Sequence, residues 1–123
     1  MPDEAAYKRR LVAEVNLLPG GYARRIEDRF AVGVLDLIIK FPDLPIVFAE
    51  GKMIVGGYLF GPTARQFAEG NKIEAAGLRA VLIGWKAGRM SVSPWREKAD
   101  ARESFTMPDL GDADALHKFL KDT

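Results

Sequence analysis

Three charged residues stand inside otherwise apolar stretches of the chain: Asp36, Glu50 and Lys52. Asp36 interrupts a β-branched, apolar run, and the other two end the next apolar run. Charged residues are seldom buried unless they are paired, and an acid in mid-strand is unfavourable without a partner. Two carboxylates beside an ammonium group can hold Mg²⁺, activate water and stabilise negative charge on a phosphoryl group. The three residues therefore indicate phosphoryl-transfer chemistry.

The sequence around these residues predicts two antiparallel strands joined by a tight turn. Residues 34–41 and 46–53 are rich in β-branched and apolar side chains, and only four residues separate them. A three-residue turn places Asp36 opposite Glu50, and side-chain alternation then gathers the three charged groups on one face. A two-residue turn would instead place Asp36 opposite Gly51 and weaken the cluster.

The predicted separation of the two acids favours a divalent cation between them. Directly opposed strand residues have Cβ atoms about 4.5–5.5 Å apart, and two carboxylates at that distance repel each other unless a cation lies between them. Mg²⁺ prefers oxygen ligands and keeps several waters, so Asp36 and Glu50 would form half of a cage and the Gly51 carbonyl would add a third ligand. Lys52 would lie beside a metal-bound water or a substrate phosphate. The residues leave open a second interpretation, an internal Asp36–Lys52 ion pair with a structural role.

The remaining sequence predicts the elements that position this hairpin, in the order αβββαββα. Such an order is typical of an α/β or α+β domain built on one sheet. The glycine-rich residues 54–61 are predicted to form a mobile loop. The other predicted elements are helices at 3–18, 62–76 and 112–120 and strands at 23–29, 80–85 and 90–95.

Composition restricts the class of protein. The 123 residues, 48% hydrophobic and 28% charged, predict a single globular domain over residues 1–123. No apolar run approaches about 18 residues, and the first residues lack an export-signal pattern, so we expect neither a membrane span nor a secretory leader. The absence of cysteine excludes disulfides and cysteine nucleophiles and fits a reducing cytoplasm. The single histidine, His117, excludes a multi-histidine zinc site.

Positive charge is concentrated towards the N-terminus. Residues 1–96 hold 14 Lys or Arg against 10 Asp or Glu, whereas residues 97–123 hold four against seven. The acidic segment 97–123 is predicted to be a solvated cap that ends in a short helix. Arg24, Arg25 and Arg29 belong to a basic group in the first third of the chain, which either faces DNA phosphates or is a solvated surface.

Several of these segments together resemble the PD-(D/E)XK nuclease superfamily: residues 33–38, residues 47–52, the helix that contains Gln66, and the strand at 80–83. The resemblance covers about residues 4–95 and is closest to small stand-alone VRR-NUC-type nucleases, which are often phage-encoded, and to Holliday-junction resolvases. It implies a restriction-endonuclease-like core, with a mixed central sheet flanked by helices. It also implies that Asp36, Glu50 and Lys52 use Mg²⁺ or Mn²⁺ to hydrolyse phosphodiester bonds in DNA. Gln66 would orient the site or the substrate, or else be an ordinary polar residue of a helix surface.

The chain departs from the superfamily at two positions and leaves the identity of one acid open. Leu35 stands where the family usually has proline, and Gly51 replaces the usual apolar residue, which predicts weaker packing under the site. The family often has a further glutamate on its first helix. The candidates are Glu4 and Glu14 on the first predicted helix and Glu27 on the next strand.

These observations predict a metal-dependent DNA endonuclease that is specific for branched DNA. The sequence contains no recognition-helix motif and no zinc finger that would read bases. One site would cut one strand per subunit, so paired cuts need a homodimer, for which Tyr58, Phe60, Trp85 and Trp95 offer a self-complementary patch. The alternatives are an inactive nuclease-fold module that binds DNA or inhibits a partner, and a structural domain with an ion-pair network. A phage-encoded nuclease would act in the host cytoplasm.

Overall fold

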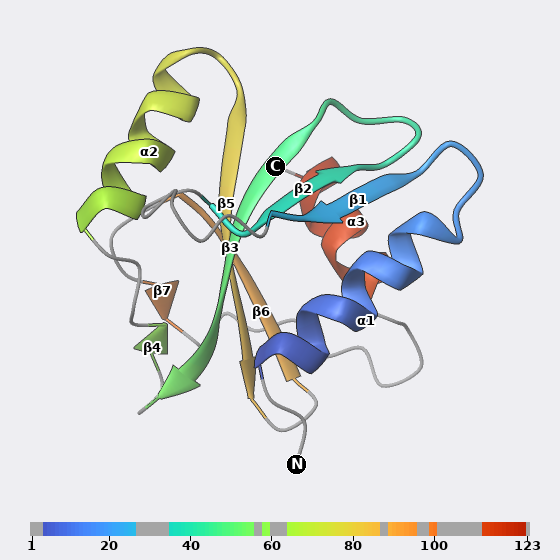
Figure 1. Ribbon diagram of the computed structural model, residues 1–123, viewed down its shortest axis with the longest axis horizontal. Coiled ribbons are helices and arrows are strands. Elements are labelled where there is room, and N and C mark those ends of the chain that lie inside the picture. The colour runs from blue at the N-terminus through green and yellow to red at the C-terminus, as the bar shows by residue number, and fades with distance from the viewer. Residues whose placement is uncertain are drawn as a thin grey trace.

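The computed structural model describes residues 4–26, 35–55, 58–59, 64–86, 89–95, 99–100 and 112–122. Its elements follow the predicted order, with two further strands of two residues each (Figure 1). The helices are α1 (Glu4–Asn16), α2 (Ala64–Ala75) and α3 (Asp112–Asp122). The strands are β1 (Tyr22–Arg25), β2 (Leu37–Lys40), β3 (Val47–Val55), β4 (Tyr58–Leu59), β5 (Arg79–Lys86), β6 (Arg89–Pro94) and β7 (Ala99–Asp100). The predicted α+β class is confirmed.

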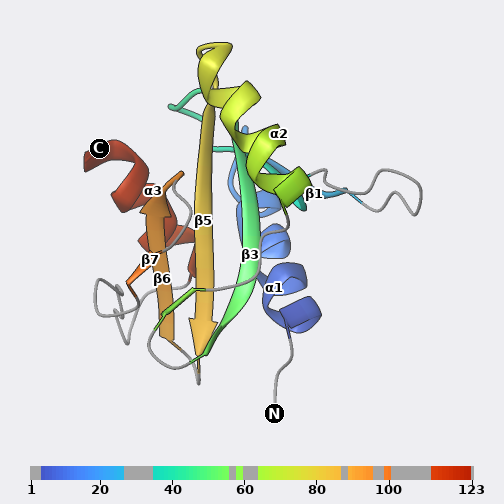
Figure 2. The ribbon, with the colours of Figure 1, turned by 90° about the vertical axis from the view of Figure 1, so that its left-hand side faces the viewer.

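The five longer strands form a mixed sheet in the spatial order β1-β2-β3-β5-β6. β3 and β5 are parallel, and every other pair in this series is antiparallel. Parallel neighbours need a long crossover connection, which α2 supplies here. Figure 2 looks onto the face that α2 covers and shows β5 between β3 and β6. β3 therefore lies inside the sheet, where its backbone position is fixed from both sides.

Helices cover both faces of the sheet. α1 and α3 lie together on one side in Figure 1, and α2 lies on the other. Tyr7, Leu11 and Val15 follow the helical period along α1 and join the main core cluster with the apolar side chains of β2 and β5. Across the sheet, Phe67 of α2 packs edge-on against Trp95, with ring centroids 5.9 Å apart. Within the described residues, no helix has the length and apolarity needed to cross a membrane.

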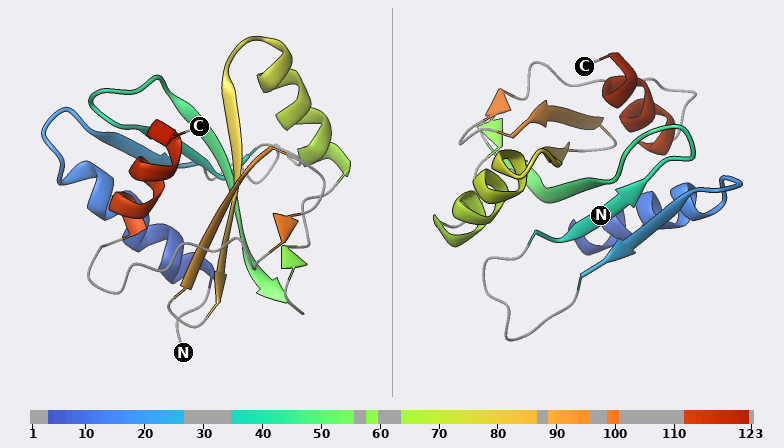
Figure 3. Two further views of the ribbon diagram at one scale, coloured as in Figure 1. Left: turned by 180° about the vertical axis from the view of Figure 1, so that it is seen from behind. Right: turned by 90° about the horizontal axis from the view of Figure 1, so that it is seen from above.

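Two predicted elements differ from the observed ones. The stretch predicted as a mobile loop carries strand structure, because β3 continues to Val55 and β4 pairs with it through Ile54 and Leu59 (Figure 3). Residues 56–57 and 60–61 lie outside the described part of the chain. α1 ends at Asn16, earlier than predicted, and the Asn16 amide exchanges two hydrogen bonds with the backbone of Ala23, at 2.9 and 3.0 Å. The Asn16 side chain thus forms the hydrogen bonds with Ala23 that a neighbouring strand would otherwise form at the start of β1.

One edge of β3 is only partly covered by other strands. β2 pairs with residues 47–49 of this edge and β4 pairs with residues 54–55, while β5 takes the opposite edge. Residues 50–53 therefore face neither β2 nor β4. The N-terminal turn of α1 reaches this gap, where the Met53 N–H donates to Glu4 Oε1 at 3.3 Å. The candidate site lies in the gap.

Candidate active site

The β2–β3 hairpin has the register that a three-residue turn predicts. Leu37 lies opposite Ala49, so the next pair along the two chains is Asp36 and Glu50. The ladder stops at this point, and the Asp36 N–H donates to the side-chain Oε2 of Glu50 at 3.2 Å. The Asp36 carbonyl accepts a hydrogen bond of 2.7 Å from the Ile26 N–H, which fixes it to the end of β1. The two acids therefore meet where the strands separate.

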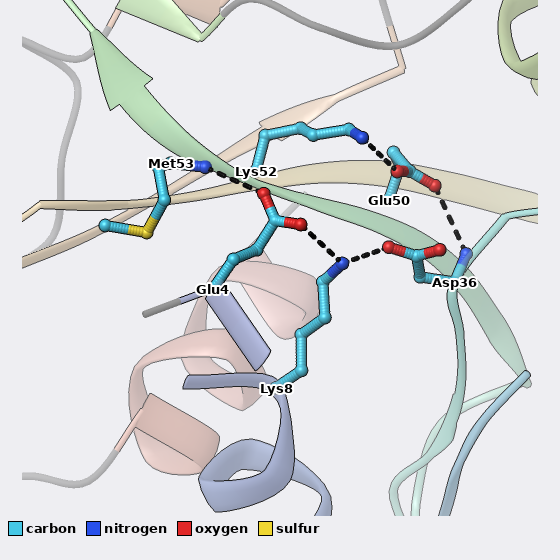
Figure 4. Close-up of polar contacts among 6 residues, drawn as sticks. All are labelled: Glu4, Lys8, Asp36, Glu50, Lys52 and Met53. Carbon is cyan, nitrogen blue, oxygen red and sulfur yellow. Dashed lines mark hydrogen bonds and ion pairs between the residues drawn. The ribbon is translucent and has the colours of Figure 1, made fainter. Parts of the chain in front are cut away.

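Lys52 lies beside the two acids, but its ion-pair partner is Glu50 and not Asp36. Its Nζ lies 3.3 Å from Glu50 Oε1, on the same face of β3 (Figure 4). Asp36 forms its ion pair with Lys8 instead. The Asp36–Lys52 ion pair considered from the sequence therefore does not form.

Glu50 has the most unusual environment of the three residues. It is 0% exposed, and its Oε1 has no hydrogen-bond donor within the described structure, although the Lys52 ammonium is near. Burial, followed by the negative charge of Asp36, raises the pKa of Glu50 to about 7, and the ammonium groups of Lys52 and Lys8 oppose this rise. A buried carboxylate oxygen without a donor is unfavourable unless another cation or donor is added.

The structure distinguishes between the candidate acids of the first helix. Glu4 lies at the site, where its two oxygens accept from the Met53 N–H and from Lys8. Glu14 lies elsewhere and accepts the Ala113 N–H at 2.9 Å, at the start of α3. Glu27 lies outside the described residues. Glu4 is therefore the acid that α1 contributes to the site.

Lys8 is a site residue that sequence reasoning missed. It is 3% exposed, and its ammonium lies between Glu4, at 3.2 Å, and Asp36 (Figure 4). The sequence does carry a signal for it, because Lys8 is four residues after Glu4 and belongs to the same helix stripe as Leu11 and Val15.

The prediction that Gly51 leaves weak packing under the site is wrong. A Cβ atom at this position would lie 2.6 Å from Trp85 Cζ3 and 3.0 Å from Lys8 Cε. The indole ring and the lysine stem therefore fill the space that a side chain would use. Leu35, the other departure from the superfamily pattern, is fully buried.

The arrangement fits a hard divalent cation. In the described ranges, no three His, Cys, Asp or Glu residues lie close enough to hold a metal ion by themselves. Asp36 and Glu50 supply two carboxylates, and the rest of a Mg²⁺ shell is ordinarily backbone oxygen and water. Alternate residues of a strand direct their N–H and C=O groups to the same edge. Gly51 thus shares the edge on which Met53 bonds to Glu4, so its carbonyl fits as the third protein ligand.

The other predicted residues are placed in different ways. Gln66 is buried on α2. Arg24 is exposed on β1 and Arg25 is half-buried, while Arg29 lies outside the described residues.

The two tryptophans of the predicted aromatic patch pack against other parts of the fold. Trp85 is fully buried and stacks on Tyr7 with ring centroids 5.5 Å apart. Trp95 packs against α2, where a Cβ at Gly70 would meet its indole at 2.0 Å. The side chain of Tyr58 and residue Phe60 lie outside the described part of the chain. Both tryptophans therefore contribute to packing within the fold.

The fold is similar to those of several solved structures. No family model matches the chain, and no curated protein sequence matches it. Eleven chains of solved structures do match. One is Archaeoglobus fulgidus Hjc, described as a Holliday junction resolvase from an archaeal hyperthermophile. The two share 16% sequence identity with a TM-score of 0.57, and the match covers 81% of this chain and 85% of the other.

Proposed function

We propose that the protein is a Mg²⁺- or Mn²⁺-dependent nuclease of the PD-(D/E)XK type that hydrolyses phosphodiester bonds in branched DNA. The observation that carries the proposal is the state of Glu50. It is a fully buried carboxylate with a pKa of about 7, one oxygen lacks a hydrogen-bond donor among the described residues, and a lysine lies 3.3 Å away. A divalent cation would satisfy that oxygen and neutralise the pair of acids.

The residues of the site would divide the work. Asp36, Glu50 and the Gly51 carbonyl would hold the ion, which would neutralise charge on the scissile phosphate and activate water. Lys52 would stabilise the negative charge that develops on the phosphoryl group. Gln66, which is buried on α2, would orient the site or the substrate.

Branched DNA is proposed as the substrate for two reasons. The similar solved structure is described as a Holliday junction resolvase. In addition, Arg9 of α1 and Arg24 of β1 are exposed and would contact phosphates without reading bases. The chain has one such site, so paired cuts across a junction would need a homodimer. Light scattering that gives a dimer mass would support this assembly, and a monomer mass at micromolar concentration would contradict it.

The test is a cleavage assay on four-way junctions, flaps, single strands and duplexes of matched sequence. We expect cleavage of branched DNA with Mg²⁺ or Mn²⁺, none with EDTA, and none by the double variant Asp36→Asn, Glu50→Gln. Asp112→Asn is the matched control, because it removes one carboxylate charge outside the site. Binding of junctions without cleavage would favour an inactive nuclease-fold module. The absence of both binding and cleavage would contradict the proposal.

A further inference from the structure

Lys8 is a buried lysine that bridges two carboxylates of the site. Its Nζ lies 3.2 Å from Glu4 Oε2 and contacts Asp36 Oδ2, and only 3% of the residue is exposed (Figure 4). A buried ammonium group is stable only where anions compensate for its lost hydration. Lys8 and the two acids therefore depend on one another.

The Lys8 side chain reaches this position across Gly51. A Cβ atom on residue 51 would lie 3.0 Å from Lys8 Cε and 2.6 Å from the Trp85 ring. Both contacts are tighter than packed side chains allow, so the two neighbours would have to move. The glycine between Glu50 and Lys52 thus makes room for a second lysine at the site.

Some carboxylate oxygens of the site contact the Lys8 ammonium group, and others would be open to a metal ion. Asp36 contacts Lys8 through Oδ2, and its Oδ1 makes no hydrogen bond or ion pair with any described residue. Glu50 contributes Oε1, which is buried and forms an ion pair of 3.3 Å with Lys52 Nζ, but accepts no hydrogen bond from the described part of the chain. The oxygens that suit a metal ion therefore belong to the Asp36–Glu50 pair, whereas Lys8 occupies the Glu4–Asp36 pair.

We infer that Lys8 takes the place of a second divalent cation between Glu4 and Asp36, so that the site binds a single metal ion. The inference rests on the proposed function. Three carboxylates and two ammonium groups carry a formal charge of −1 when all are ionised, which one divalent ion changes to +1. A second ion at Glu4 and Asp36 would need the space of the Lys8 ammonium, and like charges repel strongly in a buried site. Lys8 is a positioning residue that fixes Asp36 and limits the number of metal ions.

The test is a calorimetric titration with MnCl₂ at a pH above the pKa of Glu50. Lys8→Met removes the ammonium group but keeps the apolar stem, and Lys118→Met is the control, because Lys118 is an exposed lysine on α3. We expect one Mn²⁺ per chain for the unaltered protein and for Lys118→Met. We expect two for Lys8→Met, with the first bound about tenfold more tightly because a like charge has been removed. A purely structural role would lower the melting temperature of Lys8→Met without adding a metal ion.

The results that would overturn the inference are equally specific. They are a folded Lys8→Met variant that still binds one Mn²⁺ with unchanged affinity, or an unaltered protein that binds two. If Lys8→Met does not fold, manganese anomalous scattering from crystals of the unaltered protein decides the matter. We expect one peak beside Asp36 and Glu50, with Lys8 in place. A peak between Glu4 and Asp36 would overturn the inference and leave the nuclease proposal standing, whereas an unaltered protein that neither binds Mn²⁺ nor cuts DNA would overturn both.

Discussion

Besides its apolar stripe, helix α1 contacts the rest of the molecule through two clusters of charged side chains. The two clusters differ in how completely their carboxylates are paired. The site cluster comprises Glu4, Lys8, Asp36, Glu50 and Lys52. It joins α1 to the start of β2 and to the middle of β3. The α3 cluster comprises Arg10, Glu14 and Asp112 and joins α1 to α3. Both hold elements that are far apart in the sequence, so a structural role alone would account for either.

In the α3 cluster the carboxylates are satisfied. Asp112 Oδ2 accepts from Arg10 Nη2 at 2.5 Å and from Trp85 Nε1 at 3.1 Å. Glu14 accepts the Ala113 N–H at the start of α3, where the helix dipole favours negative charge. The hydrogen bond with Asp112 raises the pKa of Arg10, as expected for a stable ion pair.

The site cluster is neither balanced nor satisfied. It has three carboxylates for two ammonium groups, its central acid is fully buried, and the pKa of that acid is raised to about 7. Burial of an acid in this state lowers stability, and replacing buried charged groups by apolar ones is often neutral or stabilising. This difference between the two clusters supports the proposal that a divalent cation binds between Asp36 and Glu50.

The largest effect that separates the two clusters is expected on catalysis. Lys52→Ala should reduce cleavage of branched DNA by about 10²- to 10³-fold, because the lost ammonium group acts on charge that develops in the transition state. Mn²⁺ affinity should not fall, since Lys52 repels the ion that Asp36 and Glu50 hold. Single-turnover cleavage beside a manganese titration measures both. Lys118→Ala is the control, and a Lys52→Ala variant that cuts as fast as the control would show Lys52 to be structural.

The next effect concerns stability and pH. Because the pKa of Glu50 is raised from 4.5 to about 7, the folded state holds a proton between these values that the unfolded state has released. The metal-free protein should therefore lose stability as the pH rises through this range, by at most about 3 kcal/mol from this group.

The Glu50→Gln side chain does not titrate. The free energy of unfolding of this variant, relative to that of the unaltered protein, should therefore increase between about pH 5 and about pH 8. Urea unfolding in EDTA at the two pH values measures the difference. If the two proteins differed in free energy of unfolding by the same amount at both pH values, Glu50 would be ionised at both. That result would contradict the raised pKa of Glu50.

The third effect concerns the glycine under the site. Gly51→Ala should lower the free energy of unfolding by about 1–3 kcal/mol, because its Cβ would overlap Trp85 and crowd Lys8. It should also alter Mn²⁺ binding, since Lys8 would shift from Asp36. Gly77→Ala is the matched control: Gly77 has φ +82° but open space around it, so its cost should be backbone strain without any change in Mn²⁺ binding. Equal Mn²⁺ affinities for the two variants would contradict the contact between Gly51 and Lys8.

The smallest effect is expected in the α3 cluster. Asp112→Asn should lower the free energy of unfolding by about 1–2 kcal/mol, because it weakens a charge-assisted hydrogen bond. The effect is small because Arg10 is already half-exposed and water can solvate it. Cleavage and Mn²⁺ affinity should not change. Chemical denaturation and the manganese titration check the two statements. A loss of Mn²⁺ affinity in this variant would mean that the clusters are coupled through α1.

Much of the fold could be predicted from the sequence because its signals are local. Apolar and β-branched runs mark β2 and β3, and the turn length sets the register that brings Asp36 opposite Glu50. An acid inside an apolar strand is likewise a local signal, so the Asp36, Glu50 and Lys52 group was visible without the structure. The extension of β3 and its pairing with β4 were missed, because glycine-rich sequence favours a loop unless a partner strand is present.

The rest of the site could not be predicted because it depends on how α1 packs against the sheet. Lys8 reaches Asp36 across 28 residues of sequence, and its path exists only because Gly51 and Trp85 leave it open. Glu4 and Glu14 look equivalent in the sequence, because Glu4 lies four residues before Lys8 and Glu14 lies three residues after Leu11, so both border the buried stripe of α1. Only the packing of α1 against the sheet distinguishes them. The burial of Trp85 against Tyr7 again depends on tertiary packing.

The most direct test of a cation held by Asp36 and Glu50 is the melting temperature with and without MnCl₂ at about pH 8, above the pKa of Glu50. At about a hundredfold excess over Kd, a bound ion adds about 2.7 kcal/mol of stability. We expect Mn²⁺ to raise the Tm of the unaltered protein and of Asp112→Asn by the same several degrees, and to leave the Tm of the Asp36→Asn, Glu50→Gln double variant unchanged. An unaltered protein whose Tm does not respond to Mn²⁺, or a double variant that responds as strongly, would contradict the metal site.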